Sequence, residues 1–123
     1  MINSQLNRET GIYETFFGWQ VSFEEIISYI SKLKNFKDYP PRLLILTDAF
    51  DSTFELSNTE YRQIAELVRR YAAKFELLKD AIILNDPRAT AYSLLIRNES
   101  ITIPNFRFEI FSTREAAIEW LVS

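Results

Sequence analysis

Apolar and polar positions along this 123-residue chain follow two patterns, one typical of strands and one typical of helices. Short apolar stretches bounded by polar residues predict buried strands at residues 43–47, 81–84 and 106–111. Residues 12–17 are rich in β-forming side chains and also predict a strand. A turn at residues 8–11 indicates that residues 2–7 form a short strand paired with it as a hairpin.

The helices between these strands are marked by the chemistry of their first residues. Three starts carry a serine three residues before a glutamate, the spacing of a capping box: Ser22 with Glu25, Ser57 with Glu60, and Ser112 with Glu115. At a fourth start, Asp86 precedes Pro87, which is typical of an N-cap followed by proline at the first helical position. Four helices are therefore predicted.

Strands that alternate with helices predict a mostly parallel sheet with right-handed crossovers. The N-terminal hairpin would make the sheet mixed. No repeat, low-complexity tract or Gly/Ser linker interrupts the chain. We therefore expect an α/β fold in a single domain over residues 1–123, with a four- to five-stranded mixed, mostly parallel sheet and about four helices.

The composition excludes several classes of chemistry. The chain has no histidine, no cysteine and only two glycines, which removes Ser-His-Asp machinery, Cys or His metal sites and glycine-rich phosphate loops. A receiver-domain interpretation fails because no lysine follows the strand at 106–111. We expect no enzymatic activity, no cofactor and no metal.

Charge and hydropathy bear on partners and location. The net charge is −3, and the basic side chains between residues 62 and 79 are interleaved with acidic ones. Nucleic-acid binding, which depends on concentrated positive charge, is therefore not expected. The polar N-terminus is unlike a signal peptide, and no apolar run approaches the roughly 20 residues of a membrane span. We expect a cytoplasmic protein with no membrane span.

The richest polar cluster follows the strand at 43–47, where ligands bind in open α/β sheets. It contains Asp48, Asp51, Ser52 and Thr53, and Ser57 lies just beyond it. Such oxygen atoms could hold Mg²⁺ or Ca²⁺, bind another ligand, act as a switch, or simply satisfy local backbone groups. A small enzyme using Asp48 and Asp51 is a further alternative. These five residues are the candidate binding or switch residues.

Four aromatic residues, Tyr13, Phe16, Phe17 and Trp19, lie on or just after the strand at 12–17. Since alternate side chains point to opposite faces of a strand, Phe16 and Phe17 should face opposite sides. The cluster is either core or the site of an interface or apolar pocket. We expect self-association, as a homodimer, through this region.

The order of elements resembles that of the anti-sigma-factor-antagonist-like (STAS-like, SpoIIAA-like) bacterial proteins. Three segments carry the resemblance: Arg-Leu-Leu-Ile-Leu-Thr-Asp at 42–48, Ala-Ile-Ile-Leu-Asn-Asp at 81–86, and Phe-Ser-Thr-Arg-Glu-Ala-Ala-Ile-Glu-Trp-Leu at 111–121. The same superfamily includes the lipid-binding CRAL-TRIO domains.

The resemblance implies a non-catalytic regulatory or binding domain that acts through a protein partner, or alternatively a carrier or sensor of a small apolar, lipid-like ligand. In signalling members of the family, a serine within Asp-Ser-Ser-Gly at a helix start is phosphorylated. Here that start is Leu-Ser-Asn-Thr at 56–59, and Ser57 alone matches. We therefore expect Ser57 to be first of all a helix cap.

Overall fold

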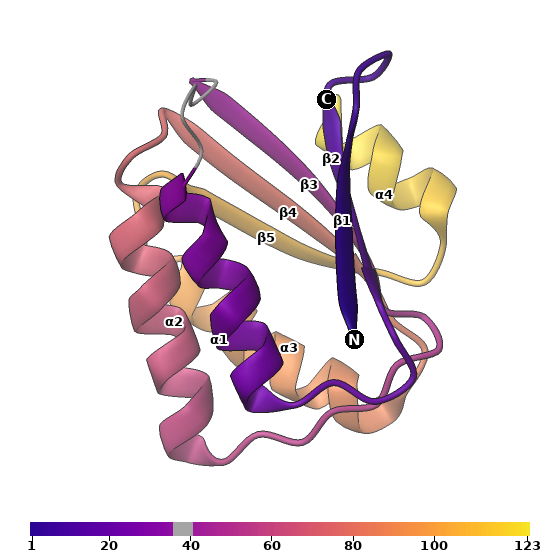
Figure 1. Cartoon of the computed structure of the whole chain (residues 1–123), viewed down its shortest axis with the longest axis vertical. Coiled ribbons are helices and arrows are strands. Elements are labelled where there is room, and N and C mark those ends of the chain that lie inside the picture. Colours follow the sequence, from indigo (N-terminus) through magenta and orange to yellow (C-terminus); the bar gives the residue numbers. More distant parts are fainter. Residues whose placement is uncertain (36–40) are drawn as a thin grey trace.

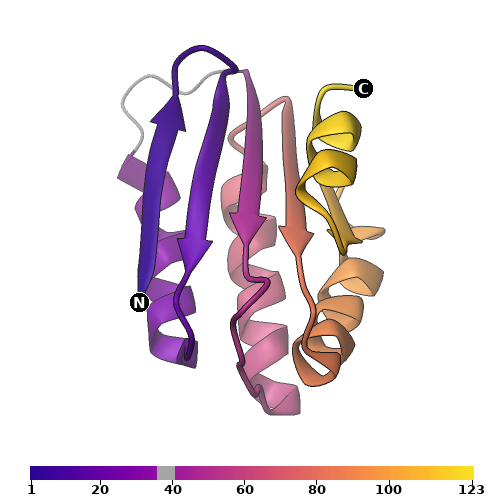
Figure 2. The same ribbon diagram turned by 90° about the vertical axis from the view of Figure 1, so that its right-hand side faces the viewer.

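Five strands form one mixed sheet, in the order in which they occur along the chain, β1-β2-β3-β4-β5. This computed structural model describes residues 1–35 and 41–123. The strands are β1 (Ile2–Asn7), β2 (Ile12–Phe17), β3 (Arg42–Asp48), β4 (Leu77–Ile83) and β5 (Phe106–Phe111). The pair β1–β2 is antiparallel and the other three pairs are parallel, as Figure 2 shows. The predicted α/β fold with a mixed, mostly parallel sheet is confirmed.

The helices divide unequally between the two faces of the sheet (Figure 1). One face carries α1 (Phe23–Ser31), which continues into the 3-10 helix η1 (Lys32–Asn35), together with α2 (Asn58–Ala72) and α3 (Pro87–Ser100). The other face carries α4 (Arg114–Leu121). Each of the first three helices connects one parallel strand to the next strand in the sheet. The three connections therefore advance across the sheet in the same direction. Right-handed crossovers then place all three on one side, and we call this side the three-helix face.

The helix starts largely follow the predicted chemistry. Both halves of the capping box are present at Ser22 and at Ser57. Asp86 accepts from the backbone N–H of Ala89 at 2.9 Å, with proline at the first helical position. The fourth start was predicted one residue too early, because Thr113, not Ser112, caps α4 and accepts from the N–H of Ala116 at 3.2 Å. Pairing with β4 extends to the end of β5, so one further residue is needed before the chain can turn into a helix.

Strand β4 is longer than predicted, because it begins at Leu77 rather than at residue 81. Its first half contains Lys79 and Asp80, whose charges hid the strand pattern. The two side chains point to opposite faces. Lys79 lies on the α4 face, where its Nζ donates to the carbonyl of Trp120 at 2.8 Å and lies 4.5 Å from the centroid of that indole ring.

Two cores result, one on each side of the sheet. The larger core lies between the sheet and the three helices on its face. The smaller core, under α4, consists of a few closely packed side chains: Ile12, Leu46, Ala81, Ile83, Ala117 and Leu121. Helix α4 contacts mainly β3, β4 and β5, and it reaches β2 through Ile12, which lies in this core, and through the bond from Arg114 to Glu14.

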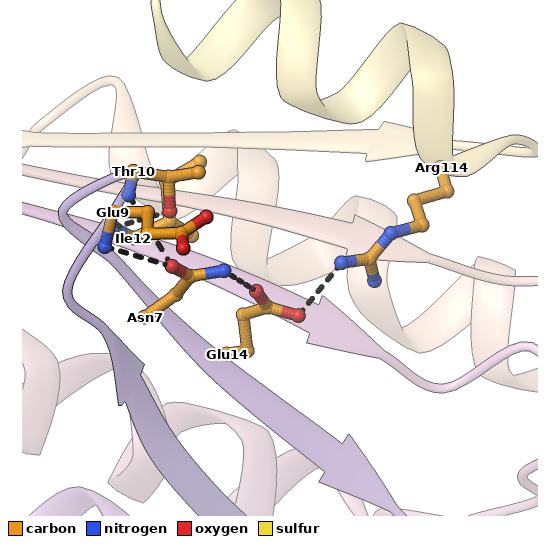
Figure 3. A network of polar contacts seen from close by, with 6 residues as sticks. All are labelled: Asn7, Glu9, Thr10, Ile12, Glu14 and Arg114. Atoms are coloured by element: carbon orange, nitrogen blue, oxygen red, sulfur yellow. Dashed lines mark hydrogen bonds and ion pairs between the residues drawn. The ribbon is translucent and has the colours of Figure 1, made fainter.

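A polar network ties the start of α4 to the N-terminal hairpin (Figure 3). The Nδ2 of Asn7 donates to Glu14 at 2.9 Å, and Arg114 donates to the other oxygen of the same carboxylate at 2.7 Å. These bonds, first that from Arg114 and then that from Asn7, hold the pKa of Glu14 below its usual value. The Asn7 side chain also accepts from the backbone N–H groups of Glu9 and Thr10, which fixes the hairpin turn.

Candidate ligand-binding cavity

A cavity of about 100 Å³ lies between the sheet and α1, α2 and α3. Its wall is almost entirely apolar and includes Phe17, Ile45, Leu56, Ile82 and Phe108. Side chains of natural cores usually fill such space, since a void removes dispersion contacts from its lining. Space is therefore left in the larger core, between the sheet and the three helices.

One carboxyl group faces this cavity. Asp80 lies on β4 between Leu78 and Ile82 in the two-residue period, so it shares their core-facing side. Protein atoms surround the side chain, yet it retains some accessible surface. That surface belongs to the cavity, which Asp80 lines.

Asp80 has little to compensate its burial. The Thr47 hydroxyl donates to its Oδ1 at 2.8 Å. No ion pair of Asp80 occurs among residues 1–35 and 41–123. Burial raises the pKa of Asp80 to about 7, while the bond from Thr47 acts in the opposite direction. Since loss of solvation disfavours the charged form, this carboxyl changes protonation state near neutral pH.

The other polar groups of the cavity wall are hydroxyls. Tyr29 of α1 exchanges a hydrogen bond of 2.7 Å with Thr15, and its pKa is raised, first by burial and then by the charge of Asp80. Tyr92 and Ser93 of α3 also line the space. The polar lining is therefore one carboxyl and several hydroxyls, contributed by β3, β4, α1 and α3.

The predicted loop residues make mostly local contacts. Asp48 accepts from the backbone N–H of Phe50 at 3.2 Å, which closes a local turn after β3. Asp51 is exposed, and Ser52 is buried with no hydrogen-bond partner for its Oγ among the described residues. Thr53 pairs with Gln20, and its N–H donates to the Trp19 carbonyl at 2.8 Å. These contacts join two loops at the carboxyl edge of the sheet.

Ser57 is the N-cap of α2. Its hydroxyl accepts from the N–H of Glu60 at 3.1 Å, and the Glu60 carboxylate accepts from the N–H of Ser57 at 2.9 Å. The expected cap is confirmed. In the part of the chain that the structure describes, no group of three or more His, Cys, Asp or Glu side chains could hold a metal ion.

The aromatic cluster divides between the two faces, as the strand period requires. Phe17 lies in the core, with its ring edge-to-face against Tyr29 and Phe54. Tyr13 is half-buried beside the same core. Phe16 on the opposite face is 49% exposed, and Trp19 is 74% exposed. Of the four interface candidates, Phe16 and Trp19 are thus the ones that present large apolar surface.

Asp80, the residue that contributes a carboxyl group to the cavity wall, was not predicted as a site residue from the sequence. The strand was expected to start at residue 81, so Lys79 and Asp80 fell in a loop. The signal was the two-residue period itself: Leu78 and Ile82 are apolar and share a face with the acidic residue between them. An acidic residue on the apolar face of a buried strand is the pattern that identifies such a site.

Comparison with known proteins places the fold in a class. No family model matches the sequence, and no curated protein matches it significantly. The structure is similar to that of an uncharacterized protein of the DUF3478 family, with a SpoIIAA-like fold, from Shewanella loihica PV-4. The TM-score is 0.63 at 15% sequence identity, over 98% of this chain and 92% of that one.

The chain therefore has a SpoIIAA-like α/β fold. This agrees with the fold that the resemblance implied, whereas a relation to CRAL-TRIO domains stays a prediction. A likeness at 15% identity carries the fold and not the function. Within the described residues, no helix is long and apolar enough to cross a bilayer.

Proposed function

We propose that this protein is a non-catalytic binding domain that holds one small, largely apolar molecule between its sheet and three helices. The observation that carries the proposal is Asp80, a buried carboxyl that faces a cavity whose remaining wall is nearly all apolar. Apolar pockets with a few convergent polar groups are the usual form of small-molecule sites. The proposal corresponds to the alternative function expected from the sequence, a carrier or sensor of a small apolar ligand, and it adds a position for that ligand.

The energetics support a functional reason for Asp80. A carboxyl moved from water into the protein interior without a cation is destabilising, and the raised pKa expresses that cost. A leucine or valine at this position would fill space and remove the penalty. The retention of a destabilising group beside unfilled space is typical of a binding site.

The size of the cavity limits the ligand. A dry cavity of about 150 Å³ in another protein binds benzene or xenon. The space here, about 100 Å³, is about two thirds of that volume, so the ligand should contain no more than about six non-hydrogen atoms, the number in benzene. The absence of histidine and cysteine from the sequence supports a binding role rather than a catalytic one.

The proposal is tested by adding benzene and xenon to protein labelled at isoleucine δ1-methyl groups. We expect saturable NMR shifts at Ile26, Ile45 and Ile82, which line the cavity, and none at Ile12 and Ile83 under α4. Ser93→Leu, which adds a side chain at the cavity wall, should remove these shifts and raise the melting temperature. Equal shifts on both faces, or none on either, would refute the proposal.

A second function, regulation through a protein partner, is favoured by the exposed Phe16 and Trp19. Phe16 lies on β2 on the α4 face of the sheet and stays half-exposed there, and exposed apolar side chains of this kind usually mark contacts. The partner proposed first is a second copy of the chain. Sedimentation of the parent and of Phe16→Ser/Trp19→Ser tests it: a concentration-dependent dimer in the parent alone supports it, and a parent that stays monomeric at millimolar concentration excludes it.

A further inference from the structure

We infer that the molecule held in the cavity is a small aliphatic amine, bound as its ammonium ion against the carboxylate of Asp80. The inference rests on the proposed function, because it names the ligand class of the same site. It comes from the polar groups that the cavity offers and from those it lacks.

Every polar group on the described cavity wall can accept a hydrogen bond. Asp80 has a carboxylate oxygen beyond the one that Thr47 engages. Tyr29, Tyr92 and Ser93 add hydroxyl oxygens from α1 and α3. An ammonium group has three N–H donors and no acceptor, so it can use several of these oxygens at once.

The described wall offers no cationic group for an anion, only hydroxyl donors. Among the described lining residues no lysine, arginine, asparagine, glutamine or tryptophan occurs, and α2 contributes only apolar side chains, Ile64 and Val68. A ligand carboxylate would bring a second negative charge next to Asp80, which opposes ionisation of both groups. A neutral alcohol would be tolerated, but it supplies a single donor and no charge.

Binding of the amine should depend on pH, because it requires Asp80 to release its proton. The groups that face Asp80 are Thr47 from β3, Tyr29 from α1, and Tyr92 and Ser93 from α3, none of which is cationic. Burial raises the pKa of Asp80 to about 7, so the empty site is partly protonated at neutral pH. An ammonium ion favours the ionised carboxylate and therefore displaces that proton.

Three ligands with one carbon skeleton test the inference: isobutylamine, isobutanol and isobutyrate, titrated at pH 8 by the same methyl NMR shifts. We expect the amine to bind at least tenfold more tightly than the alcohol, and isobutyrate to cause no shift. From pH 8 to pH 6 the affinity for the amine should fall about tenfold, since the ionised fraction of a group with a pKa near 7 falls by that factor. The affinity for the alcohol should stay within about threefold over the same range.

Asp80→Asn keeps the shape of the side chain and removes its charge. It should weaken isobutylamine binding at least tenfold at pH 8 and change isobutanol and benzene binding less than threefold. Asp48→Asn, at the exposed end of β3, is the matched control and should change none of these affinities.

The outcomes separate the two proposals. If benzene binds but the amine has no advantage over the alcohol, or keeps its advantage in Asp80→Asn, the amine inference is wrong and the binding function stands. If neither benzene nor any of the three ligands binds, both proposals fail.

Discussion

Two consecutive charged residues on β4 are buried on opposite faces of the sheet and differ in the number of partners that surround them. Lys79 points under α4, where its ammonium meets two backbone carbonyls and the Trp120 ring. Asp80 points under the three helices, where a single hydroxyl donates to it and space is left over. The first charge is compensated by the fold. The second has that hydroxyl as its one hydrogen-bond donor among the described residues, and this contrast is the reason for placing the proposed binding site on the three-helix face.

The difference has a topological origin. Three right-handed crossovers in one direction place α1, α2 and α3 on one face of the sheet. The opposite face receives only the eight residues of α4. This short helix packs over β3, β4 and β5 and over Ile12 of β2, while Phe16 of β2 stays half-exposed on the same face.

The largest expected effect concerns Asp80 and pH. The carboxyl has a pKa of about 7 in the folded protein and 3.8 as its reference value. The folded state therefore binds more protons between these values, so the free energy of unfolding should fall as pH rises from 4 to 8, by on the order of 4 kcal/mol. Urea denaturation across this range measures the slope, and Asp80→Asn should flatten it.

Asp48→Asn serves as the control and should retain the slope of the parent protein. The pKa values of Glu14 and Glu25 are lowered from 4.5 instead, so their stabilising contributions rise with pH only near and below that value and are constant over the upper part of this window. A parent protein whose stability does not change from pH 4 to pH 8 would contradict the description of Asp80.

The next effect probes the close packing under α4. Leu121 is 2% exposed, and Leu121→Ala should lower the free energy of unfolding by about 3 kcal/mol, because a well-packed site leaves a cavity when its side chain is shortened. Val122→Ala, at a neighbouring position that is 63% exposed, should change it by less than about 0.5 kcal/mol. Thermal and urea unfolding of both variants give the comparison, and similar losses for the two would show that α4 is not packed as described.

A smaller effect tests whether Lys79 holds the end of α4. Lys79→Met keeps an apolar stem but removes the bonds to the carbonyls of Trp120 and Leu121, so we expect a loss of about 1–2 kcal/mol. Hydrogen exchange should accelerate at residues 117–121 and stay unchanged in α2. Lys32→Met, at an exposed position, is the control; equal exchange in the two variants would rule out the anchoring role.

The smallest effect distinguishes two serines that look alike in the sequence. Ser57→Ala should cost about 1 kcal/mol, since it removes the hydroxyl that accepts from the N–H of Glu60, although the backbone N–H of residue 57 can still donate to the Glu60 carboxylate. Ser112→Ala should cost less than about 0.5 kcal/mol, because Thr113 is the residue that caps α4. Chemical denaturation measures the free energy of unfolding of both variants. A larger loss for Ser112→Ala than for Ser57→Ala would indicate that Ser112 caps α4, as expected from the sequence.

Much of the fold could be read from local chemistry. The capping boxes at Ser22 and Ser57 and the Asp86–Pro87 pair depend on neighbours within four residues, so the sequence predicts them directly. The apolar core of β3 and the hairpin at β1 and β2 follow from composition and period in the same way. Ser112 failed as a predicted cap because the last residue of β5 is set by pairing with β4, which is a contact between distant segments.

The sequence by itself determined which segments are strands and helices, and that the sheet is mixed and mostly parallel, because side-chain period and helix-capping chemistry act over a few residues. Only the tertiary structure decided that Asp80 faces a cavity while Lys79 meets the end of α4. The partners of a buried charge come from other elements, and the space around it depends on how three helices pack. A pattern of neighbouring residues in the sequence therefore predicts neither the partners of a buried charge nor the space around it.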